Sequence, residues 1–172
     1  LLVDLALKSQ SPQARMHALC TLDGLKLLQE KQVIQALADS SPGVRLHAVR
    51  LSNKFISQSD AVFKSVSNLV GDQDARVRCQ VAFAMGNVGP EKSKDTLIKL
   101  VKSDGEDRWM QTAILSSSAQ VGGRLLLDLL EDEAIGAGGN IGREAFLSRL
   151  SAVSSTRLEN AEMAKLLKLV AR

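Results

Sequence analysis

The two histidines of the chain are the first residues whose spacing could support metal chemistry. His17 and His47 occupy the same place in two similar phrases, SPQARMHAL and SPGVRLHAV. A catalytic zinc takes three protein ligands and a structural zinc takes four. The corresponding places in later copies of the phrase hold Gln80, Thr112 and Glu144. These residues complete no zinc site, so we expect no metal ion on this segment.

The two cysteines, Cys20 and Cys79, are far apart in the sequence and form neither a CxxC nor a CxxCH motif. The pattern therefore indicates no zinc ribbon, no disulfide framework and no covalent haem attachment. Unpaired cysteines usually behave as small hydrophobic residues. We expect both side chains to be buried in the core rather than to act as reactive thiols.

One glycine-rich stretch, GAGGNIG at 136–142, could suggest a phosphate-binding loop. It follows a helical pattern instead of a strand, and it has neither the GxGxxG spacing nor a GK[ST] ending. Two histidines confined to one repeat position offer no Ser–His–Asp or Cys–His arrangement. We therefore expect no catalytic residues, no cofactor on this segment and no enzymatic activity of its own.

The histidine phrase belongs to an internal repeat. Its arginine marks one place in each copy, and the copies follow one another at intervals of 30 to 33 residues. The five equivalent places hold Arg15, Arg45, Arg78, Met110 and Gly142. The residue before each place is of a size that suits a core: Ala14, Val44, Val77, Trp109 and Ile141. A period of this length is the signature of stacked structural repeats, so we expect Trp109 to pack in the core.

Each repeat has the pattern of two helices. Ser11 and Ser41 are suitable N-caps because each is followed by a proline, and Asp74 can cap the third copy. Glycine or polar turns at Gly24, Asn53, 86–89 and 122–123 are expected to end these second helices. Shorter apolar segments with helical spacing, such as VIQALAD and FKSVSNLV, precede them.

Stacking such pairs buries a continuous core that one pair alone cannot form. The sequence therefore predicts an all-α fold, a right-handed α-solenoid of about five HEAT-like helix pairs in a single domain. The predicted units are 1–26, 27–57, 58–89, 90–121 and 122–172. The last unit contains the longer glycine-rich stretch 131–142, and we interpret it as a modified or capping repeat.

The repeated arginines need acceptors because they lie on a helix face shared with core positions. Two aspartates lie six residues before two of them, in the turn between helices. We predict a ladder that ties each turn to a helix of the same or the neighbouring repeat. Its members are Arg15, Arg45, Arg78, Asp39 and Asp72. The alternative is an anion-binding row; Met110 at the arginine's place beside a retained Asp104 favours the structural interpretation.

A second set of positions on these helices lies opposite the predicted core, two, five and nine residues after each arginine. In stacked-helix solenoids such a row commonly lines a concave groove. The row consists of His17, Cys20, Gly24, His47, Arg50, Lys54, Gln80, Phe83 and Asn87. Its mixed character, with one basic spot at Arg50 and Lys54, suits a protein contact better than a track for phosphates.

Composition agrees with a helical protein that is not a dedicated nucleic-acid binder. The 172 residues include no tyrosine and one tryptophan, and 22 basic against 19 acidic side chains give a net charge of +3. Basic and acidic residues are interspersed rather than concentrated in a stripe. No apolar run reaches the roughly 20 residues needed to span a bilayer. The sequence begins Leu-Leu-Val without a methionine, so we expect a piece of a longer protein, and no targeting signal indicates its compartment.

Four phrases, SPQARMHALCTLDGL, SPGVRLHAVRLS, DQDARVRCQVAFAMG and DRWMQTAILSSS, carry a resemblance to a known family. Over residues 1–120 the chain resembles the HEAT-repeat segment of planctomycete-type membrane-bound dehydrogenase-like, haem-binding proteins. In that family the segment lies between a β-propeller and a cytochrome c domain. The resemblance implies a redox setting for the parent protein and a periplasmic or cell-envelope location. It places no redox residue on this segment.

Three functional hypotheses follow from the sequence. The first is a non-catalytic scaffold or protein-binding module, a spacer or docking domain within a larger haem-containing dehydrogenase-like protein. The second is a nucleic-acid-binding HEAT-like protein, suggested by the basic isoelectric point near 9.0 and by Arg50 and Lys54. The third is bilin attachment, because HEAT-like repeats occur in bilin lyases, although no residue of this chain indicates it.

Overall fold

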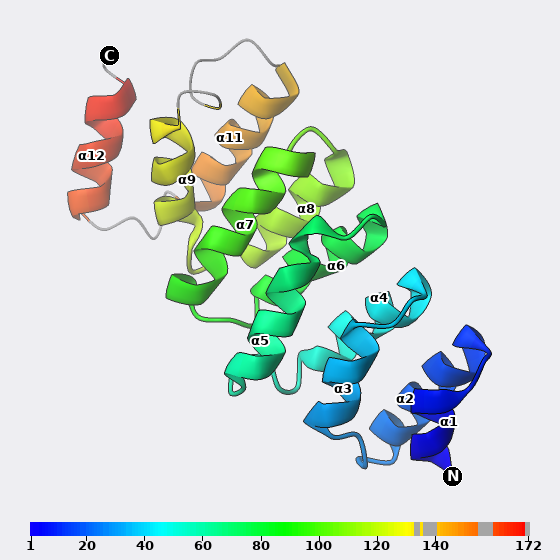
Figure 1. The fold of residues 1–172 in the computed structure, drawn as a ribbon. Helices are drawn as coiled ribbons and strands as arrows, with labels where there is room; N and C mark the ends of the chain where they lie inside the picture. The colour runs from blue at the N-terminus through cyan, green and yellow to red at the C-terminus, as the bar shows by residue number, and fades with distance from the viewer. Residues whose placement is uncertain (133–134, 136–140, 155–159, 171–172) are drawn as a thin grey trace. The chain divides into compact units, whose positions relative to one another are not determined.

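The computed structural model describes residues 1–132, 135, 141–154 and 160–170. Within these residues all regular elements are helices, eleven α-helices and one 3-10 helix, so the all-α prediction is confirmed (Figure 1). The chain divides into two compact units, Leu1–Asn87 and Val88–Arg172. The division lies close to the predicted boundary between 58–89 and 90–121. The single-domain assignment stays a prediction.

The N-terminal unit consists of three helix pairs. The pairs are α1 (Leu2–Lys8) with α2 (Pro12–Gly24), α3 (Glu30–Leu37) with α4 (Pro42–Ser52), and α5 (Asp60–Ser67) with α6 (Ala75–Met85), the last pair joined through the 3-10 helix η1 (Asn68–Gly71). The first helices contact one another in the order α1, α3, α5, and the second helices in the order α2, α4, α6 (Figure 1). The unit is therefore a two-layered stack.

The second helices begin where the sequence predicts. The Ser11 hydroxyl accepts a hydrogen bond from the Ala14 amide at 3.3 Å, and the Asp74 carboxylate accepts one from the Arg76 amide at 2.9 Å. Ser41 is the N-cap residue of α4, but its side chain forms no capping hydrogen bond. Its backbone amide instead donates to the Asp39 carboxylate at 2.8 Å, which fixes the turn that leads into α4.

The repeated core positions of the N-terminal unit are buried. Three and four residues after each arginine lie side chains with at most 2% exposure: Ala18, Leu19, Ala48, Val49, Val81 and Ala82. Because these positions recur once per repeat, each second helix presents the same small apolar stripe to its neighbours.

The C-terminal unit contains longer helices with less regular connections. Its helices are α7 (Pro90–Asp104), α8 (Arg108–Ser117), α9 (Gly122–Glu131), α11 (Ile141–Ser154) and α12 (Asn160–Val170). Helix α9 is its centre and contacts α7, α11 and α12. The glycine-rich stretch expected to modify the last repeat lies mostly at 133–134 and 136–140, outside the described residues.

The prediction that 122–123 ends a helix is wrong. Helix α8 ends at Ser117, and Gly122 is instead the first residue of α9. A Cβ atom on Gly122 would lie 2.3 Å from the Ser154 Oγ, so this glycine is needed for the close approach of α9 to the end of α11. Glycine here serves packing between helices rather than helix termination.

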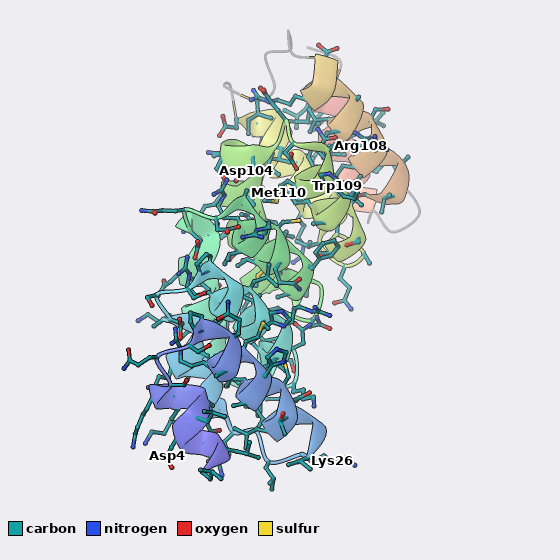
Figure 2. The ribbon with its side chains drawn as sticks, turned by 90° about the vertical axis from the view of Figure 1, so that its right-hand side faces the viewer. Asp4, Lys26, Asp104, Arg108, Trp109 and Met110 are labelled. Atoms are coloured by element: carbon teal, nitrogen blue, oxygen red, sulfur yellow. The ribbon has the colours of Figure 1, made fainter. Side chains whose placement is uncertain are left out.

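The prediction that Trp109 packs in the core is also wrong. Trp109 is 73% exposed, whereas its neighbour Met110 on α8 is 2% exposed (Figure 2). The reason is helix phase: Asp107 caps α8, so Met110 is its third residue, as Val44 and Val77 are in α4 and α6. The buried place of this repeat therefore belongs to Met110, one residue later than the sequence spacing suggests.

None of the helices within the described residues is both long enough and apolar enough to cross a membrane.

Candidate functional site

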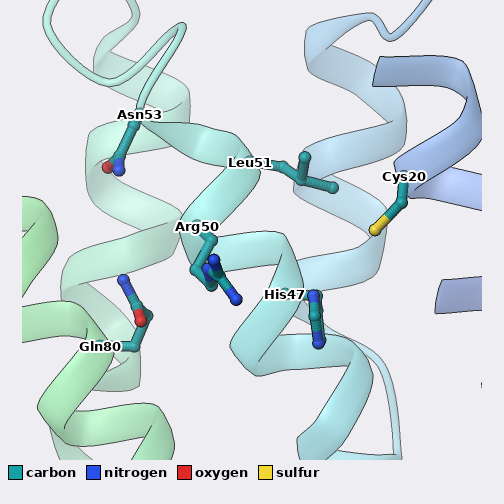
Figure 3. Close-up of a pocket in the computed structure, with 6 residues that line it drawn as sticks. All are labelled: Cys20, His47, Arg50, Leu51, Asn53 and Gln80. Carbon is teal, nitrogen blue, oxygen red and sulfur yellow. The ribbon is translucent and has the colours of Figure 1, made fainter. Parts of the chain in front are cut away.

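A groove on the N-terminal unit is the best candidate for a binding site. It has a volume of about 430 Å³ and receives side chains from α2, α4 and α6 (Figure 3). Six residues line it: Cys20, His47, Arg50, Leu51, Asn53 and Gln80. Figure 3 shows Arg50 between His47 on its own helix and Gln80 on α6, with Leu51 and Cys20 on the α2 side. The repeat thus brings residues from three successive second helices to one place.

The structure places four members of the predicted surface row in this groove, namely Cys20, His47, Arg50 and Gln80. The other members lie outside the lining but are exposed as expected: His17, Gly24, Lys54, Phe83 and Asn87. Sequence reasoning missed Leu51 and Asn53 as lining residues. Asn53 carried only a helix-end signal, and Leu51 lies six residues after Arg45, between the positions that the simple periodicity selects.

The expectation that both cysteines are buried is wrong. Cys20 is exposed and Cys79 is half-buried. Cys20 lies five residues after Arg15, on the arc of α2 that faces away from Ala18 and Leu19. The position on the helix therefore outweighs the general tendency of cysteine to be buried.

The groove carries positive charge without a carboxylate in its lining. Arg50 is exposed and forms no ion pair with any residue that the structure describes. Burial lowers the pKa of His47, and the charges of Arg50 and His17 lower it further. At neutral pH the His47 imidazole is therefore neutral, with one donor and one acceptor nitrogen. Lys54, at the edge, is neutralised by an ion pair with Asp23.

The predicted ladder residues lie together, between rather than within repeats. Arg15 donates from Nε and an η nitrogen to Asp39 at 2.6 and 2.7 Å, and Arg45 donates likewise to Asp72 at 2.6 and 2.8 Å. Each arginine also donates to the backbone carbonyl six residues before it, Arg45 to Asp39 at 2.8 Å and Arg78 to Asp72 at 2.6 Å. Each arginine of a bidentate pair thus connects its own turn with the turn of the next repeat.

These ion pairs are withdrawn from solvent. The side chains of Arg45 and Asp72 are 16% and 3% exposed. The hydrogen bond from Arg45 is the largest influence on the pKa of Asp72 and holds it below the usual value, against the opposing effect of burial. Burial raises the pKa of Asp39, but the hydrogen bonds from Arg15 and the Ser41 amide outweigh it, so this pKa is also lowered.

In the fourth repeat Gln111, not Met110, takes the place of the arginine. Its Nε2 donates to the Gly105 carbonyl, six residues earlier, at 2.8 Å and to the Gly142 carbonyl of α11 at 3.2 Å. Arg149 donates to its Oε1. The shift of one residue follows from the cap at Asp107, so the expected pairing of Met110 with a retained Asp104 used the wrong register. Gln111 is 3% exposed, and its amide forms a neutral version of the same joint.

Within the described ranges no cluster of three or more His, Cys, Asp or Glu side chains could hold a metal ion. His17 and His47 accordingly belong to the groove and its rim and not to a described ligand set.

Comparison with known proteins identifies the repeat. No curated protein matches the chain. A family model described as HEAT repeats matches residues 64–151, slightly more than half of the 172 residues. The match runs from α5 through α11 and so covers helix pairs of both units. Together with the stacked helix pairs it confirms the predicted α-solenoid class. The chain belongs to the HEAT-repeat family.

Proposed function

We propose that this chain is a non-catalytic protein-binding module, which holds a segment of a partner protein in the groove of its N-terminal unit. HEAT repeats commonly mediate protein interactions or act as scaffolds, and their fold is generally non-catalytic. The observation that carries the proposal is the groove itself, where side chains from α2, α4 and α6 converge on a space of about 430 Å³. A volume of this size is in the range of pockets that enclose a ligand, roughly 300–1,000 Å³.

The chemistry of the lining supports binding rather than turnover. His47 has Arg50, Gln80 and Asn53 as neighbours in the lining, which supply hydrogen bonds but no carboxylate to orient an imidazole as a base. Leu51 and Cys20 add apolar surface beside these polar groups. A few placed polar groups beside apolar surface is the usual composition of a recognition site.

The proposal is tested by selecting peptides from a displayed random library on the intact protein. Gln80→Trp fills the groove, and Gln35→Trp on the exposed side of α3 is the matched control in the same unit. Selected peptides should bind the wild type and Gln35→Trp alike and lose about tenfold or more in affinity on Gln80→Trp. Failure to select any peptide that depends on the groove would contradict the proposal, provided that circular dichroism shows both variants folded.

A finer proposal places the module in a larger haem-containing dehydrogenase-like protein, as a spacer or docking domain in the cell envelope. It rests on the resemblance of the repeat phrases alone. Sequencing the coding region on both sides tests it directly. A propeller-type region upstream and a CxxCH motif downstream would support it, and a start codon before Leu1 with a stop codon after Arg172 would contradict it.

Nucleic-acid binding remains the alternative function. Its motivation was the basic spot at Arg50 and Lys54, and the ion pair between Lys54 and Asp23 reduces the charge of that spot. Binding to DNA should then be weak and should not fall steeply with salt, because few phosphates would be neutralised. Tight binding with a steep salt dependence, lost on Arg50→Glu, would favour the alternative.

A further inference from the structure

The groove differs in charge from the rest of the N-terminal unit. Elsewhere in this unit basic side chains are paired with carboxylates: Arg15 with Asp39, Arg45 with Asp72, Arg76 with Asp74 and Lys54 with Asp23. The six lining residues of the groove, by contrast, include one arginine and no acidic residue. The groove therefore lacks the anion that its surroundings supply to each of these four cations.

Hydrogen-bond donors surround this unmatched charge. The guanidinium of Arg50 offers five N–H groups, and the amides of Gln80 and Asn53 and the neutral imidazole of His47 offer more. Figure 3 shows Arg50 between His47 and Gln80, so an acceptor placed against the guanidinium lies within the reach of groups from α4 and α6. A carboxylate is the acceptor that an arginine fork matches best in a protein ligand.

We infer that the groove binds an acidic peptide segment, with a carboxylate of the partner at Arg50 and an adjacent apolar side chain against Leu51 and Cys20. This inference rests on the proposed protein-binding function and names the chemistry of its partner. The lowered pKa of His47 agrees with it, because the first cause is burial and the next are the positive charges of Arg50 and His17. The imidazole stays neutral and so leaves Arg50 as the cation that receives the carboxylate.

A peptide suits the groove better than a nucleic acid does. Nucleic-acid affinity comes from neutralising several phosphates along a track of cations. Lys54, the nearest candidate for such a track, is held by Asp23, and Arg76 on α6 is held by Asp74. One free guanidinium beside a small apolar surface fits a single carboxylate with a neighbouring side chain.

The test uses three short fluorescein-labelled peptides with repeating Gly-Asp-Leu, Gly-Asn-Leu and Gly-Lys-Leu sequences and a single-stranded oligothymidylate, titrated by fluorescence anisotropy against the intact chain. The salt concentration is held at about 0.15 M, so that long-range attraction is screened. The aspartate peptide should bind at least about tenfold more tightly than the asparagine peptide, and the lysine peptide should not bind.

Two variants with the same change in net charge locate the effect. Arg50→Glu should weaken the aspartate peptide by about tenfold or more, whereas Lys64→Glu, on the exposed surface of α5 and outside the groove, should change it by less than about twofold. Equal losses in the two variants would overturn the inference, because they would mean a general charge effect.

The remaining outcomes separate this inference from the function beneath it. If library-selected peptides bind in a manner lost on Gln80→Trp but the aspartate peptide is no better than the asparagine peptide, the acidic preference is wrong and the protein-binding function stands. If no peptide shows groove-dependent binding, both are wrong. If the oligothymidylate binds more tightly than the aspartate peptide and also requires Arg50, the ligand is a nucleic acid and the inference is overturned.

Discussion

Arg45 and Arg50 lie on the same helix, α4, and have opposite surroundings. Arg45 is 16% exposed and donates to the Asp72 carboxylate, to Asp39 O and, at 3.0 Å, to Ser40 O. Arg50 is exposed, lines the groove and forms no ion pair with a described residue. The same side chain thus connects two repeats at one position and faces solvent at the other.

The difference follows from the distance of each residue from the helix cap. Arg45 is the fourth residue of α4, so its guanidinium reaches the carbonyl groups of the turn before the helix and the turn of the next repeat. Arg50 comes more than one turn later, on the arc away from Ala48 and Val49. A guanidinium whose donors are already used stabilises the stack, whereas one with unused donors is available to a ligand.

The largest stability effect is expected for Arg45→Ala. Asp72 is 3% exposed, and removal of the arginine leaves its carboxylate without the cation that compensates its burial. The free energy of unfolding should fall by about 2–4 kcal/mol, measured by urea denaturation followed by circular dichroism. Arg76→Ala is the control, since its ion pair with Asp74 is formed by a 73% exposed side chain and should contribute less than about 1 kcal/mol. Equal losses would show that burial of the joint is unimportant.

The neutral joint of the C-terminal unit should be the next most sensitive. Gln111→Leu retains the size of the side chain but leaves the Gly105 carbonyl without its donor and Arg149 without its acceptor. We expect a loss of about 1–3 kcal/mol in the free energy of unfolding. Thr112→Val, at the exposed neighbouring position, should lie within about 0.5 kcal/mol of the wild type. If Gln111→Leu were as stable as the control, the amide would not substitute for the arginine.

Acid should distinguish the charged joints from the neutral one. The pKa of Asp72 is lowered in the folded protein, chiefly by the hydrogen bond from Arg45, so the folded state binds this proton less readily than the unfolded state. Its contribution to stability is present above the unfolded pKa of about 3.9 and is lost as the pH falls through the lower folded pKa. Thermal unfolding between about pH 6 and pH 2 should therefore show a smaller pH dependence in Asp72→Asn than in the wild type. An unchanged dependence in the variant would contradict the assignment.

The smallest stability effect is expected for Arg50→Gln. Because Arg50 is exposed and outside any described ion pair, its replacement should change the free energy of unfolding by less than about 0.5 kcal/mol. The same urea titration used for Arg45→Ala measures it. A loss comparable with that of Arg45→Ala would mean that Arg50 has a structural partner, and the contrast between the two arginines would disappear.

The repeat made much of this arrangement predictable from sequence. Caps such as Ser11 and Asp74 locate the second helices, and periodicity then selects both the buried positions and the outward row that contains Arg50 and Gln80. What the sequence could not give was the phase of α8. One residue of difference between repeats moves Trp109 to the surface and gives the arginine's place to Gln111, and only the cap at Asp107 determines that phase.

Partners across repeats were equally hidden from the sequence. The aspartate nearest to Arg45 in the sequence is Asp39, but the bidentate partner is Asp72 of the next turn. Which turn lies beside a guanidinium depends on the stacking of neighbouring pairs, a tertiary contact that spacing along the chain does not specify. The same limit applies to Leu51, whose place in the groove depends on the position of α2 beside α4.

The contrast between the two arginines is tested most directly by the affinity of the aspartate peptide for Arg45→Gln and Arg50→Gln, measured by anisotropy where circular dichroism shows both variants folded. Arg45→Gln should bind within about twofold of the wild type despite its lower stability, and Arg50→Gln should bind about tenfold or more weakly despite its unchanged stability. Equal affinities for the two variants, or a loss confined to Arg45→Gln, would contradict the division of roles between the joint and the groove.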